Sequence, residues 1–196
     1  MTRYDIGTVV SVALGLAVLL GWYLSYSAAR LDRLHAKVEG AISALDAQLV
    51  RRAEASLELA TTGALDPAST LLLADAAGAA AERHTEHPIS DDLLDGQHFA
   101  GNESVESDLT WALRAALTDA VVADLKARDD DTHEVLRRVQ ASALRVQLAR
   151  RFLNDAVTEV RRVRAKPVVR VFRLAGRATL PTLVVFDDEL PAALRS

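Results

Sequence analysis

The residues best suited to chemistry lie in a polar stretch near the middle of the chain. His84 and His87 are three residues apart, and Glu82, Glu86 and Asp91 are close to them. Imidazole and carboxylate groups are ligands that Zn²⁺ accepts in proteins. The stretch lacks the H-E-x-x-H spacing that places a general base beside a catalytic metal. A solvated polar loop is therefore the simpler interpretation, and we expect no metal site and no cofactor.

Other signatures of catalysis are missing from the sequence. There is no Cys, which excludes disulfides and thiolate chemistry, and there is no G-x-S-x-G, G-x-G-x-x-G or phosphate-loop motif. Paired carboxylates occur at Asp91-Asp92 and at 129–131, but the second set is typical of a helix boundary. Asp187-Asp188-Glu189 is expected to be a solvated tail. We therefore expect no catalytic residues and a protein that is not an enzyme.

The charges are divided unevenly along the 196 residues, which are enough for one domain with its own core. The net charge is −4, yet residues 54–134 contain 18 acidic and 4 basic residues, whereas residues 137–177 contain 12 basic and 2 acidic ones. Clustered Arg could indicate nucleic-acid binding. The acidic total and the 5% of aromatic residues argue against it, because few rings can stack on bases. We expect no nucleic-acid partner.

The first 29 residues have the pattern of a transmembrane anchor. No charged residue occurs between Asp5 and Arg30, a run of 24 positions. A bilayer core of about 30 Å needs roughly 20 apolar helical residues, so this run is long enough to span it. Tyr4 lies at one end of the run and Trp22, Tyr23 and Tyr26 lie near the other, as aromatic residues do at membrane interfaces. The predicted span includes Ile6, Leu14, Leu20, Trp22 and Tyr23.

A cleaved signal peptide is the alternative interpretation of this segment. Ser27-Ala28-Ala29 could serve as a small-residue cleavage site, but the apolar run is longer than that of most signal peptides. Basic residues decide the orientation of a span. Arg3 precedes the span, whereas Arg30, Arg33 and Lys37 follow it. We therefore expect a single-pass protein of the cell membrane with its N-terminus outside and most of the chain in the cytoplasm.

The rest of the chain has helical periodicity. Apolar residues recur every three or four positions at Leu31, Leu34, Val38, Ile42, Leu45, Leu49 and Ala53. This stripe predicts that the anchor continues as one helix to about Thr62, with Gly63 just past its end. Asp66-Pro67 is typical of a helix start, and that helix should reach Arg83. Residues 84–101 are expected to form a long loop.

Two more helices are predicted after this loop. The first runs from Asn102 to about Arg128, and the second from Asp131 to about Lys166. Asp131 and Glu134 have the spacing of a capping box. The fold class is therefore all-α: a transmembrane helix that continues into an antiparallel up-down bundle of about four helices (30–166), followed by a C-terminal segment (167–196). Self-association through the 31–53 stripe as a coiled coil is the alternative.

A second membrane contact follows from this topology, because the last helix of an alternating bundle returns to the membrane. Beyond Pro167, apolar and basic residues alternate as in an interfacial helix over 167–177. The predicted contact with anionic lipid consists of Arg161, Arg162, Arg164, Lys166, Arg170, Phe172, Arg173 and Arg177. The alternative is that these cations pair with the acidic middle helices.

Two segments resemble the LemA family. Residues 45–52 (LDAQLVRR) resemble its first helix, and residues 149–157 (ARRFLNDAV) are similar to its R-x-x-Y-N-x-x-V helix, although Leu153 stands where the family favours Tyr. The positions that carry the resemblance are Asp46, Leu49, Arg51, Arg52, Arg150, Asn154 and Val157. The resemblance implies a membrane-anchored helical bundle with no catalytic site to transfer.

Two functions are compatible with these features. The first is a membrane-anchored, non-catalytic interaction scaffold, with the lipid bilayer and a protein as partners and with homo-oligomerisation as a further possibility. The second is a membrane-associated metal-binding or hydrolytic protein that uses the 84–101 loop. The anchor, the bundle pattern and the charge division favour the first.

Overall fold

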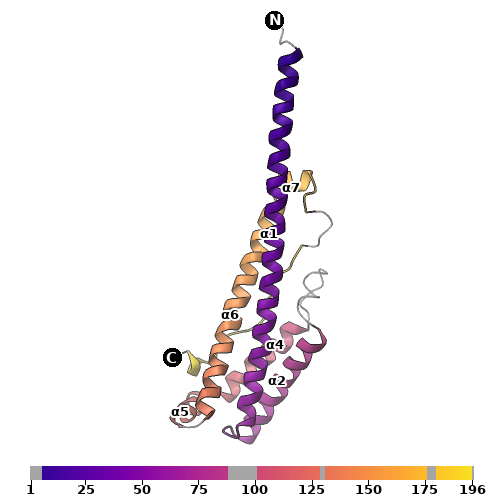
Figure 1. Ribbon diagram of the computed structural model, residues 1–196. Helices are drawn as coiled ribbons and strands as arrows, with labels where there is room; N and C mark the ends of the chain where they lie inside the picture. The colour runs from indigo at the N-terminus through magenta and orange to yellow at the C-terminus, as the bar shows by residue number, and fades with distance from the viewer. Residues whose placement is uncertain (1–5, 88–100, 129–130, 176–179, 196) are drawn as a thin grey trace.

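The computed structural model describes residues 6–87, 101–128, 131–175 and 180–195 (Figure 1). The elements in this part of the chain are all helices, with no strand, which confirms the all-α fold class. They are α1 (Ile6–Thr61), α2 (Pro67–Glu86), α4 (Asn102–Ala116), α5 (Asp119–Ala127), α6 (Asp131–Arg164), α7 (Pro167–Val171) and the 3₁₀ turn η1 (Ala192–Leu194).

Helix α1 has two parts with opposite surroundings. From Gly7 to Tyr23 every side chain is exposed, although the segment is apolar. It projects beyond the rest of the molecule in Figure 1. From Leu31 to Ala53 the predicted apolar stripe is buried at every position. One helix in the described chain, α1, is apolar and long enough to cross a membrane, and none of its apolar window is buried.

The lower half of the molecule is a four-helix bundle. Helices α1, α2, α4 and α6 lie alongside one another there, each antiparallel to the next along the chain, and α5 closes the end (Figure 1). Their shared core contains fully buried side chains from all four helices, among them Leu59, Leu73, Leu109 and Val139. The predicted antiparallel bundle is thus present in this half.

The upper half is narrower, because α2 and α4 have only 20 and 15 residues. Helix α6, with 34 residues and a length of about 51 Å, continues beside α1 without them. The C-terminal segment supplies the missing cover: Val184 and Phe186 join a second core with Leu45, Leu153 and Val157. The four-helix bundle therefore continues as a pair of helices, α1 and α6, which the C-terminal segment covers.

Two predicted helix boundaries are confirmed in detail. Gly63 adopts a positive φ of 71° just beyond the end of α1, the conformation that glycine tolerates best. The Asp66 side chain caps α2, accepting hydrogen bonds from the backbone N–H groups of Ala68 (3.0 Å) and Ser69 (3.1 Å). Proline at the first helical position needs no hydrogen bond there.

The predicted single helix from Asn102 to Arg128 is wrong, since the chain leaves the helix at Leu117 and Thr118 and restarts as α5. The Thr118 side chain accepts a hydrogen bond from the N–H of Val121 at 3.4 Å, so a capping residue with an acidic neighbour marks the break. Periodicity alone missed it because the apolar spacing is kept across the break.

The interfacial helix predicted over 167–177 is also shorter than expected. Only Pro167–Val171 is helical, and Arg173 reverses the chain with a φ of 51°. Residues 176–179, including Arg177, lie outside the described residues. Val171 and Phe172 are exposed, whereas Val169 is the buried residue of α7.

Candidate functional site

Four ionisable side chains meet inside the bundle, where α1, α2 and α4 pack together. Asp46 and Arg52 come from α1, His84 from the last turn of α2, and Glu106 from the second turn of α4. The side chains of Arg52, His84 and Glu106 are no more than 2% exposed. We call these four residues the buried charge cluster. The prediction that residue 84 lies in a solvated loop is therefore wrong, because α2 extends to Glu86 and buries it.

Arg52 is bound on two sides of its guanidinium group. One nitrogen forms an ion pair with the Glu106 carboxylate and also donates to the Glu106 backbone carbonyl at 3.1 Å. Another nitrogen donates to the Thr110 hydroxyl at 3.1 Å. Charged groups are rarely buried in proteins unless such partners are present. The cluster thus fixes α4 against α1 by contacts that a neutral side chain could not reproduce.

His84 lies between two carboxylates. Its Nε2 is 2.5 Å from Oε1 of Glu106, and its Nδ1 is 3.2 Å from Oδ1 of Asp46. Burial alone lowers the pKa of an imidazole, but the two carboxylates outweigh it and raise the pKa of His84 to about 9. The imidazole is therefore protonated at neutral pH, and it lies beside the ion pair of Arg52 and Glu106.

This arrangement fits a structural role better than a catalytic or metal-binding one. A metal ligand must be a neutral imidazole with a free ring nitrogen, and both nitrogens of His84 face a carboxylate. Among the described residues, no group of three or more His, Asp and Glu is arranged to hold a metal ion. His87 is exposed, and the remaining residues of the predicted loop, including Asp91 and His98, lie outside the described part.

The C-terminal segment lies along the bundle, so Asp187-Asp188-Glu189 is not the free tail that we predicted, although Asp187 and Glu189 are exposed as expected. Asn154 pairs with the backbone of Val184 in both directions, donating to its carbonyl and accepting from its N–H, each at 2.9 Å. Arg150 donates to both carboxylate oxygens of Asp188, at 2.6 and 2.9 Å. These contacts hold extended chain against α6.

The same segment covers the buried charge cluster. The ring of Phe186 lies between the guanidinium groups of Arg52 and Arg150, whose central carbons are 6.0 and 5.5 Å from its centroid. The backbone carbonyl of Asp187 accepts a hydrogen bond from Thr110 at 2.7 Å. Burial raises the pKa of the Asp187 carboxyl, but hydrogen bonds from the Glu189 N–H and from Arg114 outweigh it, so the pKa is lowered.

The residues that carry the family resemblance are concentrated in these internal contacts. Asp46 and Arg52 belong to the buried charge cluster, and Arg150 and Asn154 hold the C-terminal segment. Leu49 and Val157 are fully buried. Arg51 is exposed and lines a surface groove. Six of the seven positions therefore maintain the fold, and none presents a reactive group to solvent.

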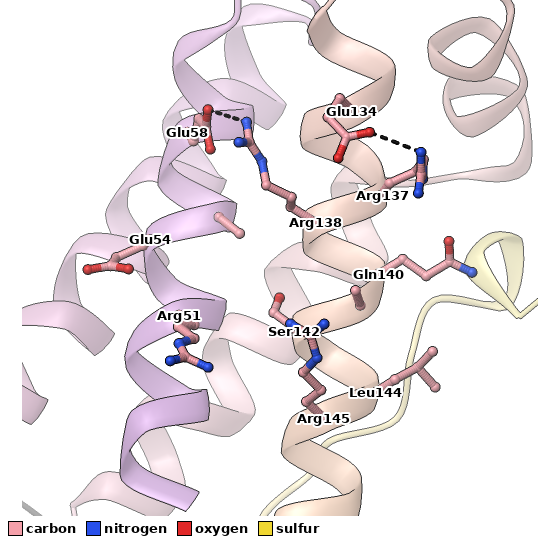
Figure 2. A pocket seen from close by; sticks show the side chains of 12 residues that line it. Arg51, Glu54, Glu58, Glu134, Arg137, Arg138, Gln140, Ser142, Leu144 and Arg145 are labelled. Atoms are coloured by element: carbon pink, nitrogen blue, oxygen red, sulfur yellow. Dashed lines mark hydrogen bonds and ion pairs between the residues drawn. The ribbon is translucent and has the colours of Figure 1, made fainter. Parts of the chain in front are cut away.

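That groove runs between α1 and α6 in the lower half and has a volume of about 580 Å³ (Figure 2). Four arginines and three glutamates line it: Arg51, Arg137, Arg138, Arg145, Glu54, Glu58 and Glu134. Arg138 pairs with Glu58 at 2.5 Å, and Arg137 pairs with Glu134 at 3.1 Å. We call it the paired groove, because carboxylates of the same surface form ion pairs with two of its four arginines.

The predicted membrane-contact residues gather at the other end of α6. Arg161, Arg162 and Arg164 lie in its last turns. Lys166 directly precedes α7, and Arg170 lies in α7. The Arg161 side chain donates to the backbone carbonyl of Pro181 at 2.9 Å. The alternative, pairing with the acidic middle helices, finds no support in the described residues. The ion pairs of α6 arginines join them instead to α1, to α6 itself or to the C-terminal segment.

Sequence reasoning missed Glu106, Thr110 and Phe186. A signal for the first two was present, because Asn102, Glu106 and Thr110 occupy one face of α4 together with buried Leu109 and Leu113. Polar residues at helical spacing within an apolar stripe indicate a buried polar network. Phe186 had no such signal, because its contacts with Arg52 and Arg150 depend on a chain reversal far along the sequence.

Comparisons with known proteins do not assign a family to the chain. It matches no family model, no curated protein and no solved structure. The resemblance to the LemA family thus stays a prediction. What the protein does has to be argued from its own geometry.

Proposed function

We propose that the protein is a non-catalytic interaction scaffold that α1 anchors in the cell membrane. The observation that carries this proposal is the continuity of α1: its exposed apolar part passes into the buried stripe of the bundle without a break. A rigid helix of 56 residues, about 84 Å long, would hold the bundle at a fixed distance from the bilayer. The LemA-like residues, which maintain the same bundle, agree with this proposal.

The proposed orientation places the bundle in the cytoplasm. More Lys and Arg residues follow the span than precede it, which favours a cytoplasmic location for the part of the chain after the span. The ends of α6 and α7 lie beside α1 just below its projecting part (Figure 1). Their cations would meet the anionic surface of that leaflet, where each is worth about 1 kcal/mol.

A partner surface is available on α6. Leu144, Leu148 and Phe152 are spaced four residues apart and are 45–65% exposed, and a hollow of about 250 Å³ lies between this stripe and α1. Arg145 and Arg151 flank the stripe and are exposed. An apolar stripe with basic edges is complementary to an amphipathic helix that has acidic edges. We therefore propose that the scaffold's protein partner is an amphipathic helix with acidic edges.

The metal-binding or hydrolytic alternative has less support. It needs His84 as a neutral ligand or base, and this residue is buried, paired with two carboxylates and protonated at neutral pH. The other groups on which it would depend lie outside the described residues or are exposed.

Membrane fractionation of the full chain tests the anchoring. The intact chain should stay in the pellet after alkaline carbonate extraction. The double variant Leu14→Arg/Val18→Arg should move to the supernatant, because each arginine costs about 3 kcal/mol at the centre of a span. Leu71→Arg/Leu144→Arg places the same charges on exposed positions of the bundle and should stay in the pellet. A soluble mature chain that begins near Arg30 would overturn the proposal.

Light scattering of the full chain in detergent tests the α6 surface. If the partner of this surface is an acidic helix of another protein, the isolated chain should be monomeric. A dimer that is lost in Phe152→Glu would assign the stripe to a second copy instead.

A further inference from the structure

A hollow lined by arginines lies at the end of the bundle next to the membrane span. It has a volume of about 770 Å³ and is formed where α6 ends, α7 turns and the C-terminal segment begins its return. Arg161, Arg164, Arg170 and Arg173 line it, together with apolar side chains that include Val169 and Leu180. We call it the membrane-proximal hollow.

Two cations of this hollow, Arg170 and Arg173, have no carboxylate close to them in the sequence. Seven basic residues and no acidic residue occur between Glu159 and Asp187. Glu159 itself pairs with Arg30 and Lys37 on α1, at 3.8 and 3.3 Å. Within the described residues, the ion pairs involve neither Arg170 nor Arg173. A concave surface with uncompensated guanidinium groups favours an anion, above all a phosphate, whose oxygens match their N–H groups.

The backbone at Arg173 provides a second, independent observation. Its φ of 51° is in the left-handed region, and the N–H of Leu174 donates to the Val169 carbonyl at 3.0 Å, as in a Schellman motif that ends a helix. Glycine is the usual residue at this position, and a larger side chain costs roughly 1 kcal/mol or more there. An arginine in place of the glycine that the backbone favours indicates that its side chain has a use beyond the turn.

The position of the hollow along α1 indicates which phosphate it meets. Because Arg30 pairs with Glu159 and α6 is antiparallel to α1, the residues beyond Glu159 lie level with the stretch of α1 that precedes Arg30. This stretch contains Trp22 and Tyr26, which stack with centroids 6.3 Å apart, as expected of an interfacial pair. Val171 and Phe172, 73% and 45% exposed, offer apolar side chains at the same level.

We propose that the membrane-proximal hollow binds the phosphate group of an anionic phospholipid in the leaflet where α1 leaves the membrane. The guanidinium groups of Arg170 and Arg173 donate to the phosphate oxygens, and the acyl chains run beside the exposed part of α1. This inference rests on the proposed anchoring, and it goes further by assigning one lipid to one site. A general attraction of the basic surface to the bilayer would not select a bound lipid.

Native mass spectrometry of the full chain in a neutral detergent tests this site. With added phosphatidylglycerol, the chain should retain one lipid molecule, at least five-fold more than with phosphatidylcholine. Arg170→Gln/Arg173→Gly should lower the retention of phosphatidylglycerol to that of phosphatidylcholine. Because glycine suits the backbone at position 173, this variant removes two cations without straining the turn, and its thermal unfolding temperature should be no lower than that of the wild type.

A matched control removes two arginines elsewhere. Arg137→Gln/Arg138→Gln in the paired groove should leave the retention of phosphatidylglycerol unchanged. Inorganic phosphate at 10 mM should not displace the lipid, and displacement would assign the site to free phosphate and overturn the proposal. Equal retention of the two lipids by the wild type would also overturn it. If the wild-type chain meanwhile stays in the carbonate-resistant pellet, the anchoring stands and only the lipid site fails.

Discussion

The paired groove and the membrane-proximal hollow are each lined by four arginines, yet their surroundings differ. In the groove, Glu54, Glu58 and Glu134 stand among the cations, and two ion pairs form (Figure 2). In the hollow, no carboxylate occurs among the lining residues. The groove is lined by residues 51–58 of α1 and 134–145 of α6, whereas the hollow is lined by residues from the end of α6 onward, next to the span. The same residue type therefore meets opposite electrostatic conditions at two sites.

The buried charge cluster extends this comparison to the interior. Arg52 is nearly as buried as an apolar core residue, and the Glu106 carboxylate is its counter-charge. Arginine thus occurs in three settings: buried with a carboxylate, exposed with one, and exposed without one. Removal of one partner should be costly in the first setting, because it leaves a buried charge unpaired, and should cost little in the second. The proposed lipid site uses the third setting, so we expect neighbouring carboxylates, rather than the number of arginines, to decide where an anion binds.

The largest effect is expected when the carboxylate is removed from the interior. Glu106→Gln keeps the size of the side chain but leaves Arg52 and protonated His84 with one counter-charge fewer, so it should destabilise the fold by about 3–5 kcal/mol. Chemical denaturation of the full chain in detergent measures the free energy of unfolding. Asp108→Asn, which removes an exposed carboxylate from the same helix, should change it by less than about 0.5 kcal/mol. Equal effects of the two variants would contradict the structural role of the cluster.

The second prediction concerns pH, because His84 gains its proton more strongly in the folded state. Its pKa is raised from 6.5 to about 9, so its contribution is complete below pH 6.5 and is lost as the pH rises through 9. The free energy of unfolding should fall by about 3 kcal/mol between pH 6 and pH 9.5. His84→Gln should be less stable at pH 6 and should lack this decline. A decline of the same size in that variant would assign the pH dependence to other groups.

Features of the fold could be predicted from the sequence where they depend only on residues within about one helix turn of each other. The buried stripe of α1, the Asp66 cap and the positive φ of Gly63 depend on residues at most a few positions apart. The break at Thr118 is of the same kind and shows the limit of periodicity. Thr118 caps a new helix at this point, although the apolar spacing continues on both sides of it.

Features that depend on distant partners could not be predicted in this way. Asp188 belongs to a run of acidic residues typical of a solvated tail, and only the return of the chain along α6 brings it to Arg150. His84 continues the stripe of Leu73, Ala77 and Ala80 at helical spacing, but its partners come from α1 and α4 and have no local signal in the sequence. The basic character of residues 161–177 could be predicted from composition, whereas the hollow they form depends on the turn at Arg173.

The smallest effect is expected when the carboxylates of the paired groove are removed, so that its charge resembles that of the membrane-proximal hollow. In Glu58→Gln/Glu134→Gln, the paired groove loses the carboxylates of both its ion pairs while its four arginines remain. These pairs are exposed, so stability should fall by no more than about 1 kcal/mol in total. The variant should gain weak binding of soluble dihexanoyl phosphatidylglycerol, measured by titration calorimetry in detergent, at a site that the wild type lacks.

The second site must be separated from the membrane-proximal hollow, which should bind the same lipid. We therefore combine Glu58→Gln/Glu134→Gln with Arg170→Gln/Arg173→Gly, so that any remaining heat comes from the groove. Binding that is abolished by 0.5 M salt would show that uncompensated charge suffices to create an anion site, since exposed charges are screened at that ionic strength. Absence of binding in the combined variant would show that the shape made by α7 and the Arg173 turn matters as much as the missing carboxylates. The hollow would then owe its selectivity to its geometry, and the comparison of charges alone would fail.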